Sequence, residues 1–401
     1  MSVNTYFNEF LSAIRLTKHQ REDLITGHTT LRDRLNADPD LSKIIVSTFL
    51  QGSYRRATAI KPKNGKRADV DIIVVTKLDR YSVRPKEAIE KFIPFVEKYY
   101  KGKYSIQGRS IGIELSYVDL DIVVTSAPSE VDQALFKSES VTTSLALEDL
   151  GGDWRLVKGW AEPDHRQYWT TQMAESVRSA AEWKTASLYI PDQDANCWVE
   201  TNPLEQIRWT RDKNKATNSH YINVVKALKW WRICKLTDLK HPKGYPIEHM
   251  IGDCCPDGIS SVAEGVVKTF EAIVNKYAWN RSIEITPSLP DRGVSTHNVW
   301  KRVSSEDFVA FYDHVKTAAA TARKAYDAEL VSESAQYWRY LFGSDFPIMS
   351  EEEARNERLA KKAQQLETGG ASLGNRVNII TGTTGVSVPR ERNHYDDSRH
   401  I

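Results

Sequence analysis

Cysteine is scarce in this chain, with four residues among 401. Two of them, Cys254 and Cys255, are adjacent, so a framework of disulfide bonds is excluded and reduced thiols are expected. Long hydrophobic runs are missing as well, because no segment reaches the roughly 18 apolar residues of a membrane span. The N-terminal residues lack the charged and then apolar pattern of a signal peptide. We therefore expect a cytoplasmic protein with no role in a membrane.

An excess of charge of one sign is also absent. Fifty-five Lys and Arg residues stand against 53 Asp and Glu residues, which leaves a formal net charge of +2. Proteins that coat nucleic acid have a strongly basic profile, and this chain does not. Any site for an anion must therefore be local.

Two lobes are expected, because 401 residues exceed the usual size of one compact core. Residues 1–200 are predicted to form the first lobe, with one long amphipathic helix, or two, over 5–36 and a β-rich stretch over 44–125. A helix over 85–100 interrupts the β-rich stretch, and 126–200 is a connecting region with many tryptophans. A sheet of four or five strands with helices against one face accounts for this pattern.

The rest of the chain is predicted to be mostly helical. Residues 201–345 form the second lobe, a helical bundle. Its expected helices are 203–217, 219–236, 246–254, 260–279, 305–330 and 333–342. Residues 346–401 contain a charged helix over 351–365 and then a flexible tail, because 366–401 is rich in Gly, Thr, Ser and Asn and has little to bury. The fold class is therefore α+β, with a sheet lobe packed against a helical lobe.

A glycine and a serine follow the first apolar strand, in the stretch FLQGSYRRATAI. The strand ends at Gln51, Gly52 permits a tight turn and a close approach of the backbone, and Ser53 opens the next helix with its hydroxyl and free amides. These groups suit a phosphate. Six basic residues and no acid lie between this turn and the next strand, of which Arg55 and Arg56 are nearest. This stretch predicts a local site for polyphosphate.

Paired aspartates begin two later strands, in DVDIIVV and DLDIVV. The period of two along a strand puts Asp69 and Asp71 on one face and turns Val70 into the core. Asp119 and Asp121 repeat the pattern on a strand expected beside the first. Carboxylates so close together repel each other unless a cation lies between them. Three carboxylates from two strands are what two Mg²⁺ ions need to hold the phosphates of a nucleotide and an attacking hydroxyl.

Each of these signals has an ordinary structural explanation when it stands alone. A Gly-Ser pair is usually a turn, and an Asp-x-Asp is usually an exposed strand face. Here two such acidic pairs lead into aliphatic runs typical of buried strands, although aspartate is a poor strand former. The conjunction favours a metal site over the structural explanation.

The order of these motifs resembles that of the polymerase-β-like nucleotidyltransferases, in the branch of oligoadenylate synthetase and cyclic GMP-AMP synthase. Residues 5–345 look like the bacterial CD-NTases, and the clade D members in particular. The segments that carry this resemblance are FLQGSYRRATAI, QGRSIGIELSYVDLDIVV, QIRW, HYINVVKALKWWR and KGYPIEHMIG. The resemblance implies a polymerase-β-like sheet lobe, a helical lobe and an active site in the cleft.

The resemblance also implies roles for particular residues. The family's Gly-Ser turn holds the triphosphate, which implicates Gly52 and Ser53 together with the strand end at Gln51. The first two metal ligands carry over to Asp69 and Asp71. Asp121 is the better match for the third ligand, because the aliphatic run follows it directly, whereas Asp119 stands two residues earlier on the same face.

A lysine of the helical lobe is implicated in the same way. Oligoadenylate synthetase has a Lys-x-Trp on a long helix, and its lysine reaches the triphosphate of the donor nucleotide. Lys229, followed by Trp230 and Trp231, fits this pattern, and Lys226 lies one turn earlier on the same face. Lysines on helices are ordinarily solubilising, but this one is flanked by large apolar residues.

The function implied is the synthesis of a cyclic oligonucleotide from ATP and other NTPs, as a second messenger in bacterial anti-phage defence (CBASS). A cyclic trinucleotide containing adenine is favoured over a dinucleotide. Two Mg²⁺ ions are the expected cofactors, with Mn²⁺ as a substitute, and pyrophosphate is the leaving group. Two alternatives stay open: transfer of AMP to a protein, a tRNA or a small molecule, and a non-catalytic interaction scaffold.

The resemblance also bears on partners. A downstream effector would bind the cyclic product, and the C-terminal tail would suit a regulatory or conjugation partner. A zinc ribbon like that of cyclic GMP-AMP synthase is not expected, because the spacing of His249, Cys254 and Cys255 does not fit one and no fourth ligand follows. Without that ribbon and without a long basic face, activation by long double-stranded DNA is not expected.

Overall fold

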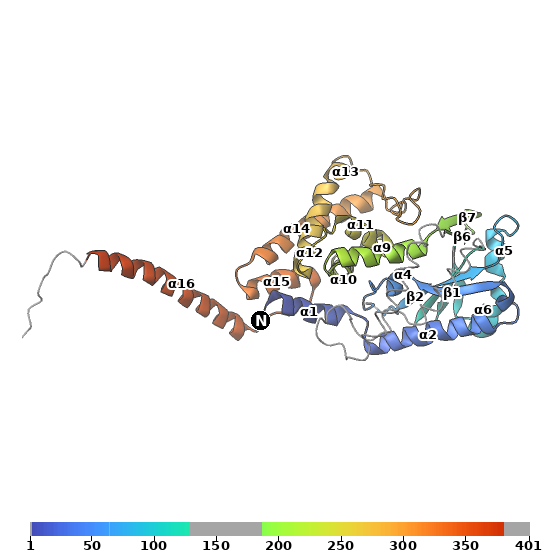
Figure 1. Cartoon of the computed structure of the whole chain (residues 1–401), viewed down its shortest axis with the longest axis horizontal. Helices are drawn as coiled ribbons and strands as arrows, with labels where there is room; N and C mark the ends of the chain where they lie inside the picture. The colour runs from blue at the N-terminus through green and yellow to red at the C-terminus, as the bar shows by residue number, and fades with distance from the viewer. Residues whose placement is uncertain (1, 64, 128–186, 381–401) are drawn as a thin grey trace, which may run out of the picture. The chain divides into compact units, whose positions relative to one another are not determined.

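The computed structural model describes residues 2–63, 65–127 and 187–380, with side chains up to residue 366. It divides into two compact units, Met1–Ile348 and Met349–Ile401. Among the described helices, none combines the length and the apolar character needed to cross a membrane. The four cysteines are all described, and each is a free thiol. The larger unit contains a sheet and a group of helices (Figure 1).

A five-stranded sheet is the frame of the candidate site. Its strands, in chain order, are β1 (Ile45–Gln51), β2 (Asp69–Thr76), β3 (Tyr104–Ile106), β4 (Ile111–Glu114) and β5 (Asp119–Val124). Their order across the sheet is β1-β2-β5-β4-β3, and β2 and β5 form its parallel pair. The sequence prediction of four or five strands is confirmed. The two strands that begin with aspartates lie side by side.

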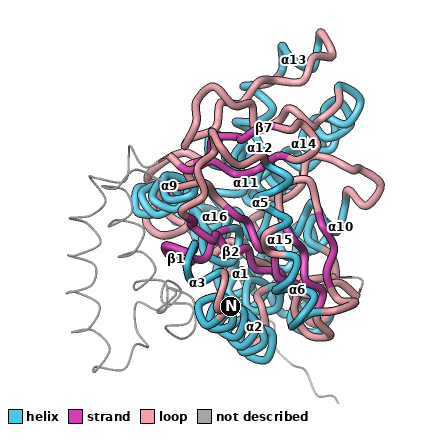
Figure 2. The backbone as a smooth tube through the Cα atoms, turned by 90° about the vertical axis from the view of Figure 1, so that its right-hand side faces the viewer, coloured by secondary structure: helices cyan, strands magenta, loops and turns pink. Residues whose placement is uncertain are grey.

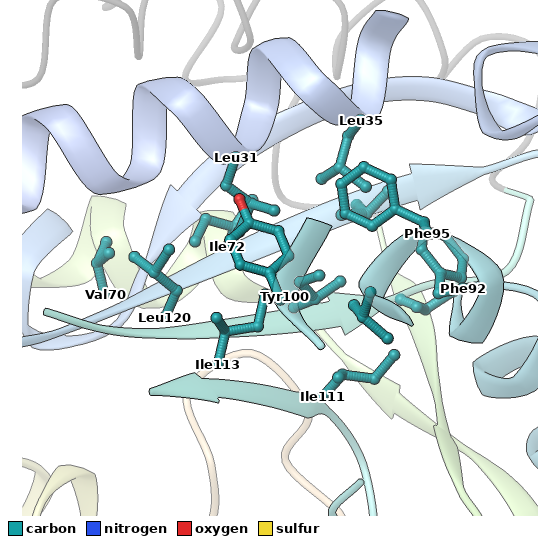
Figure 3. Packing of buried hydrophobic residues seen from close by; sticks show 14 of the residues in the cluster. Leu31, Leu35, Val70, Ile72, Phe92, Phe95, Tyr100, Ile111, Ile113 and Leu120 are labelled. Carbon is teal, nitrogen blue, oxygen red and sulfur yellow. The ribbon is translucent and has the colours of Figure 1, made fainter. Parts of the chain in front are cut away.

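One face of the sheet packs on helices and forms the main hydrophobic core. Helix α2 (Lys18–Ala37) lies beside the sheet in both overall views (Figures 1 and 2). It contributes Leu31 and Leu35 to this core. Helices α5 (Pro85–Glu90) and α6 (Ile93–Tyr100) belong to the same layer. Val70 and Ile72 of β2 point into this core beside Leu120 of β5 (Figure 3). The alternation of β2 therefore turns its aspartates to the opposite face.

The opposite face is covered by a second layer that the sequence did not predict. A hairpin of β6 (Leu188–Asp192) and β7 (Cys197–Thr201) forms a separate two-stranded sheet, and α9 (Pro203–Ala216) follows it. Ile73 and Val75 of β2 pack with Leu188 of the hairpin and with Leu204 and Ile207 of α9. The prediction of helices against one face of the sheet was thus incomplete, because the other face is covered as well. The aspartates lie on this second face, toward the helical part of the unit.

The helical part is built around α10 (Tyr221–Lys235). The helices that accompany it are α11 (Tyr245–Cys254), α12 (Val262–Lys276), α13 (Ala278–Ser282), α14 (Ser305–Asp327) and α15 (Val331–Phe342). Most side chains of α10 are buried, including both Trp230 and Trp231. The helices predicted from 203 to 342 are all present, with ends that differ by a few residues. This agreement reflects the clear helical spacing of apolar residues in this half of the chain.

Of the two possibilities expected over 5–36, one long helix or two, the structure has two helices, α1 (Val3–Ile14) and α2. A new helix begins after Thr17, which caps it. The Thr17 hydroxyl accepts from the Gln20 backbone N–H, and the Gln20 side-chain oxygen accepts from the Thr17 N–H, which is a capping box. Helix α1 packs on α10, α12 and α15. Phe10 of α1, for example, stacks on Phe342 at a centroid distance of 4.6 Å. Helix α1 therefore packs on helices assigned to the second lobe. The boundaries proposed for the lobes otherwise stay a prediction.

The helix expected over 85–100 is also interrupted, between α5 and α6. Pro94 lies in the first turn of α6, where its missing N–H costs nothing, whereas inside one long helix it would remove a hydrogen bond.

The smaller unit contains α16 (Glu351–Ile380), which begins with three acidic residues. Negative charge is favourable at a helix N-terminus. The predicted charged helix 351–365 is present, and the helix continues through 366–380, which the sequence assigned to the flexible tail. The last part of the predicted tail, 381–401, lies outside the described residues. The same holds for 128–186 of the predicted connecting region.

Candidate active site

The Gly-Ser turn lies directly against an aspartate of the neighbouring strand. Gln51 pairs with Asp71 across β1 and β2, and the one-turn helix α4 (Gly52–Arg55) begins at the next residue. Gly52 has a φ of +79°, and a Cβ there would overlap Asp71 Oδ2. Glycine is required on both counts. The close backbone approach expected at Gly52 is thus present, and the group approached is a carboxylate.

The four aspartates lie in exact lateral register. Asp69 pairs with Asp119 and Asp71 pairs with Asp121 across the parallel strands β2 and β5. Val70 between the first two is 1% exposed, as the period of two predicts. The register concentrates negative charge at the ends of two adjacent strands.

Two of these carboxyls, Asp71 and Asp121, have raised pKa values. Burial, followed by repulsion from Asp69 and Asp121, raises the pKa of Asp71 to about 7. Burial, followed by repulsion from Asp69 and Asp119, raises the pKa of Asp121 to about 6. A cation among these groups would relieve both the desolvation and the repulsion.

The carboxylate of Asp119 is paired with the guanidinium of Arg67. Arg67 Nε donates to Asp119 Oδ1 at 2.6 Å, and Arg67 Nη2 donates to Glu114 Oε2 at 3.3 Å. Asp121 instead accepts a long bond of 3.4 Å from the neutral amide of Gln107. The charge of Asp119 is therefore already paired, and that of Asp121 is not paired by these contacts. The geometry favours Asp121 over Asp119 as a ligand.

These residues fit divalent metal ions, which the resemblance to the polymerase-β-like nucleotidyltransferases implies. Carboxylate oxygens are the hard donors that such ions prefer, and their mutual repulsion is what bound cations would offset. Among the described residues, no three acidic, histidine or cysteine side chains already stand together as a metal centre. The strands bring Asp69, Asp71 and Asp121 together in register, while their side chains are not gathered around one point.

A cavity of about 720 Å³ opens beside the carboxylates, within the usual range of ligand pockets. The predicted site residues that line it are Gln51, Gly52, Ser53, Asp69, Asp71 and Lys229. Asp121 and Lys226 are outside the lining. Lys226 is 8% exposed and is buried within the helical part. The structure thus brings six of the eight predicted residues to one cavity.

Basic side chains dominate the charge of the lining. Those that line the cavity are Arg56, Lys61, Lys63, Lys66, Arg67, Arg109, Lys229 and Arg232. Among the basic residues of this stretch, Arg55 and Arg56 were predicted to matter most, because they adjoin the turn. The loop lysines contribute more of the wall, and Lys63 also lies 4.1 Å above the ring of Trp230. A polyphosphate is the ligand that this wall suits.

Lys229 lies in the cavity wall and forms an ion pair with a buried glutamate, Glu248. Its Nζ donates to Glu248 Oε1 at 2.8 Å and to the Thr58 carbonyl at 2.9 Å. The other oxygen of Glu248 accepts from Thr58 Oγ1 at 2.9 Å and from Arg56 Nη2 at 3.2 Å. Burial alone would raise the pKa of Glu248, but Lys229 and Arg56 hold it below its ordinary value. One carboxylate therefore ties α10 and α11 to the segment that follows the Gly-Ser turn.

Glu248 and Thr58 are site residues that the sequence reasoning missed. Glu248 lies within KGYPIEHMIG, a segment quoted for its resemblance without a role for the acid. Its 4% exposure was the missing information, since an unpaired buried carboxylate is very costly. An acid at a buried position of a predicted helix was the signal that could have found it.

Residues 1–127 match a family model described as the Second Messenger Oligonucleotide or Dinucleotide Synthetase domain. A protein of Salmonella paratyphi B named probable cyclic AMP-AMP-GMP nucleotide synthase is 48% identical over 354 residues. The match covers 87% of this chain and 93% of that relative. A cyclic AMP-AMP-GMP synthase of Enterobacter hormaechei is 47% identical over 355 residues, again covering 87% of this chain and 93% of the relative.

A solved structure shares the fold at low sequence identity. The structure of the CD-NTase CdnG of Bradyrhizobium diazoefficiens, in complex with GTP, covers 85% of this chain and 95% of its own. Its TM-score is 0.60 at 13% identity, so the likeness bears on the fold alone. It confirms the predicted α+β class, in which a polymerase-β-like sheet is joined to a helical part.

Proposed function

Because this chain belongs to the CD-NTase family, the bacterial nucleotidyltransferases that make cyclic oligonucleotides, we propose that it makes a cyclic trinucleotide containing adenine. Its relatives of nearly half identical sequence are named for cyclic AMP-AMP-GMP, and they match it over most of their length. The product proposed here is accordingly built from ATP and GTP, with one pyrophosphate released for each bond.

The observation that carries this proposal is the close approach of Gly52 to the Asp71 carboxylate, both of which line a basic cavity. The turn at Gly52 and Ser53 holds the triphosphate of the donor nucleotide through its backbone amides and hydroxyl. Three lysines line the same cavity, Lys61 and Lys66 on the loop and Lys229 on α10. They neutralise the negative charge of the triphosphate. We assign no such role to Lys226, which does not line the cavity.

Asp69, Asp71 and Asp121 are the residues that would hold two Mg²⁺ ions, with Mn²⁺ as a substitute. When bound, these ions neutralise the triphosphate and lower the pKa of the attacking ribose hydroxyl. The carboxylates themselves must be deprotonated to bind them, so the raised pKa values of Asp71 and Asp121 oppose binding at low pH. Arg67 keeps Asp119 out of this set by neutralising it.

The biological setting proposed is anti-phage signalling in the cytoplasm, where NTPs are available. The cyclic product would act on a downstream effector that binds it. A regulatory or conjugation partner at the C-terminal tail is part of the same proposal, and it is supported by the composition of 366–401 alone.

Product analysis tests this function. The purified chain is incubated with all four NTPs and Mg²⁺, and then with each NTP omitted in turn, and the products are identified by mass spectrometry. We expect a phosphatase-resistant cyclic trinucleotide that disappears when ATP is omitted and changes composition when GTP is omitted. Transfer of AMP to the protein or to an added tRNA, without a small cyclic product, would contradict the proposal.

A further inference from the structure

A buried acid of the helical part, Glu248 of α11, lies in the wall of the cavity beside the aspartates. Burial would raise its pKa, but Lys229 and Arg56 hold the pKa below its ordinary value, so the acid carries its negative charge. The side chains of these two partners are 11% and 4% exposed. Buried ion pairs often add no stability over apolar packing. The place of this one in a cavity wall therefore points to a role in binding.

Glu248 is fixed by the segment that follows the Gly-Ser turn. Its Oε2 accepts from Thr58 Oγ1 at 2.9 Å and from Arg56 Nη2 at 3.2 Å and Nε at 3.3 Å. The same segment is bonded to the turn, since the backbone N–H of Arg56 donates to the Gly52 carbonyl at 3.1 Å. Hydrogen bonds that involve charged groups are the strong ones. The other oxygen of Glu248 is thus an acceptor at a fixed place relative to the turn.

That other oxygen, Oε1, holds the ammonium of Lys229 at 2.8 Å. An ammonium has three N–H donors, and among the described residues Lys229 Nζ donates to two acceptors, Glu248 and the Thr58 carbonyl. Because Lys229 lines the cavity, its third donor is left for a group bound there. The lysine side chain is a flexible four-carbon chain, so the two acceptors decide where that donor points.

The charges of this cluster do not cancel. Lys229 and Arg56 contribute two positive charges and Glu248 one negative charge, which leaves an excess of one positive charge. A neutral residue in place of Glu248 would raise that excess to two. If the acid mattered only through its charge, an anion would then bind more tightly. If it holds Lys229 in place, the anion would bind more weakly, because two buried cations without a counter-ion repel each other and the flexible lysine turns away.

Resting on the proposed function, we propose that Glu248 is a positioning residue, which holds the ammonium of Lys229 against the triphosphate of the donor nucleotide. Arg56 and Thr58 fix the carboxylate, and the carboxylate fixes the ammonium. Glu248 acts through Lys229 and not by contact with the nucleotide. The triphosphate site is therefore completed by a lysine of the helical part whose distance from the Gly-Ser turn is set by one acid.

Binding of inorganic tripolyphosphate in the presence of Mg²⁺ tests this role, because the probe carries the phosphates of an NTP without the base or the ribose. Its Kd is measured by calorimetry for the full chain and for Glu248→Gln. The matched control is Glu271→Gln, which removes the same charge outside the cavity lining. Glu271 also joins two helices, since its two oxygens accept from Arg323 at 2.8 Å each.

We expect Glu248→Gln to raise the Kd for tripolyphosphate about tenfold, because a charge-assisted contact to phosphate is lost. The control should stay within about twofold of the wild type. Glu248→Asp is the second variant, which keeps the charge but is one methylene too short to hold both Lys229 and Arg56. It should also raise the Kd. In a Lys229→Met background, Glu248→Asp should change the Kd by less than about twofold, since the group that it positions is gone.

An unchanged or lower Kd in both folded variants at position 248 would overturn the inference. An equal rise of the Kd with and without Lys229 would also overturn it, because Glu248 would then act on the fold as a whole. The proposed function is tested separately, by the products that the wild type forms from NTPs. A wild type that binds tripolyphosphate through Lys229 and Glu248 but forms no cyclic product would contradict that function and leave the role of Glu248 standing.

Discussion

Lys229 Nζ lies 2.8 Å from Glu248 Oε1, so that an ammonium of α10 and a carboxylate of α11 meet in the wall of the cavity. The same carboxylate accepts from Arg56, four residues after Gly52. Breaking one partner of a buried charged network is costly, because the remaining charge is left in a poorly solvated place. Lys229 therefore lines the cavity, and through Glu248 it also helps to hold the segment that follows the Gly-Ser turn.

Lys229→Ala should therefore weaken nucleotide binding. We expect the KM for NTPs to rise about tenfold, since a charge-assisted contact contributes roughly 1.5–3 kcal/mol. The melting temperature should fall modestly, because Glu248 keeps Arg56 and Thr58 as partners. Steady-state kinetics and thermal melting check the two effects. A lower melting temperature with an unchanged KM would show that Lys229 serves packing alone.

Gly52→Ala should abolish product formation and lower stability. The new Cβ would overlap Asp71 Oδ2, and the alanine would have to keep the positive φ of Gly52, which is strained for a residue with a side chain. Gly65→Ala is the matched control, because Gly65 has a similar φ of +72° with no atom within 4 Å of its Cβ position. Activity that survives in the control but not at Gly52 assigns the loss to the carboxylate contact. Equal effects of both substitutions would assign it to backbone strain.

The two aspartates of β5 should differ in their importance. Asp121→Asn is expected to lose activity by at least about a hundredfold, because a ligand charge is removed. Asp119→Asn should keep substantial activity, because its carboxylate is already paired with Arg67. Turnover of the two purified variants at saturating Mg²⁺ decides between them. The reverse order would move the third ligand to Asp119.

The metal-free protein should become less stable as the pH rises. The pKa of Asp71 is about 7 in the folded protein, compared with an ordinary value near 4 for aspartate. A raised pKa adds stability at low pH that is lost as the pH rises through about 7. With EDTA present, the melting temperature should be lower at pH 8 than at pH 5.5, and Asp71→Asn should reduce that difference. An unchanged difference in melting temperature in the variant would show that the pKa of Asp71 is not raised in the folded protein.

The sequence was sufficient for the parts of the site that depend on strand geometry. The period of two fixed the shared face of Asp69 and Asp71, and the repeated Asp-x-Asp pattern indicated that a second strand would lie beside the first. The glycine before Ser53 indicated the close approach at the turn. These features are local, so spacing and residue type carry them.

Contacts between distant segments could not be predicted in the same way. Glu248 reaches Arg56 across 192 residues, and no periodicity indicates which residues will meet at such a separation. The packing of α1 on α10 and the cover that the β6–β7 hairpin gives the second face depend equally on the folded chain.

Pyrophosphate release by Asp71→Asn, measured beside the wild type with ATP, GTP and Mg²⁺, tests the central claim most directly. Asp71 lies in the cavity, is the partner of Asp121 in register and contacts the turn at Gly52. We predict cyclic trinucleotide and pyrophosphate from the wild type and none above background from the variant. The metal-free variant should melt at or above the wild-type temperature. Near-wild-type turnover in a folded Asp71→Asn protein would contradict the account.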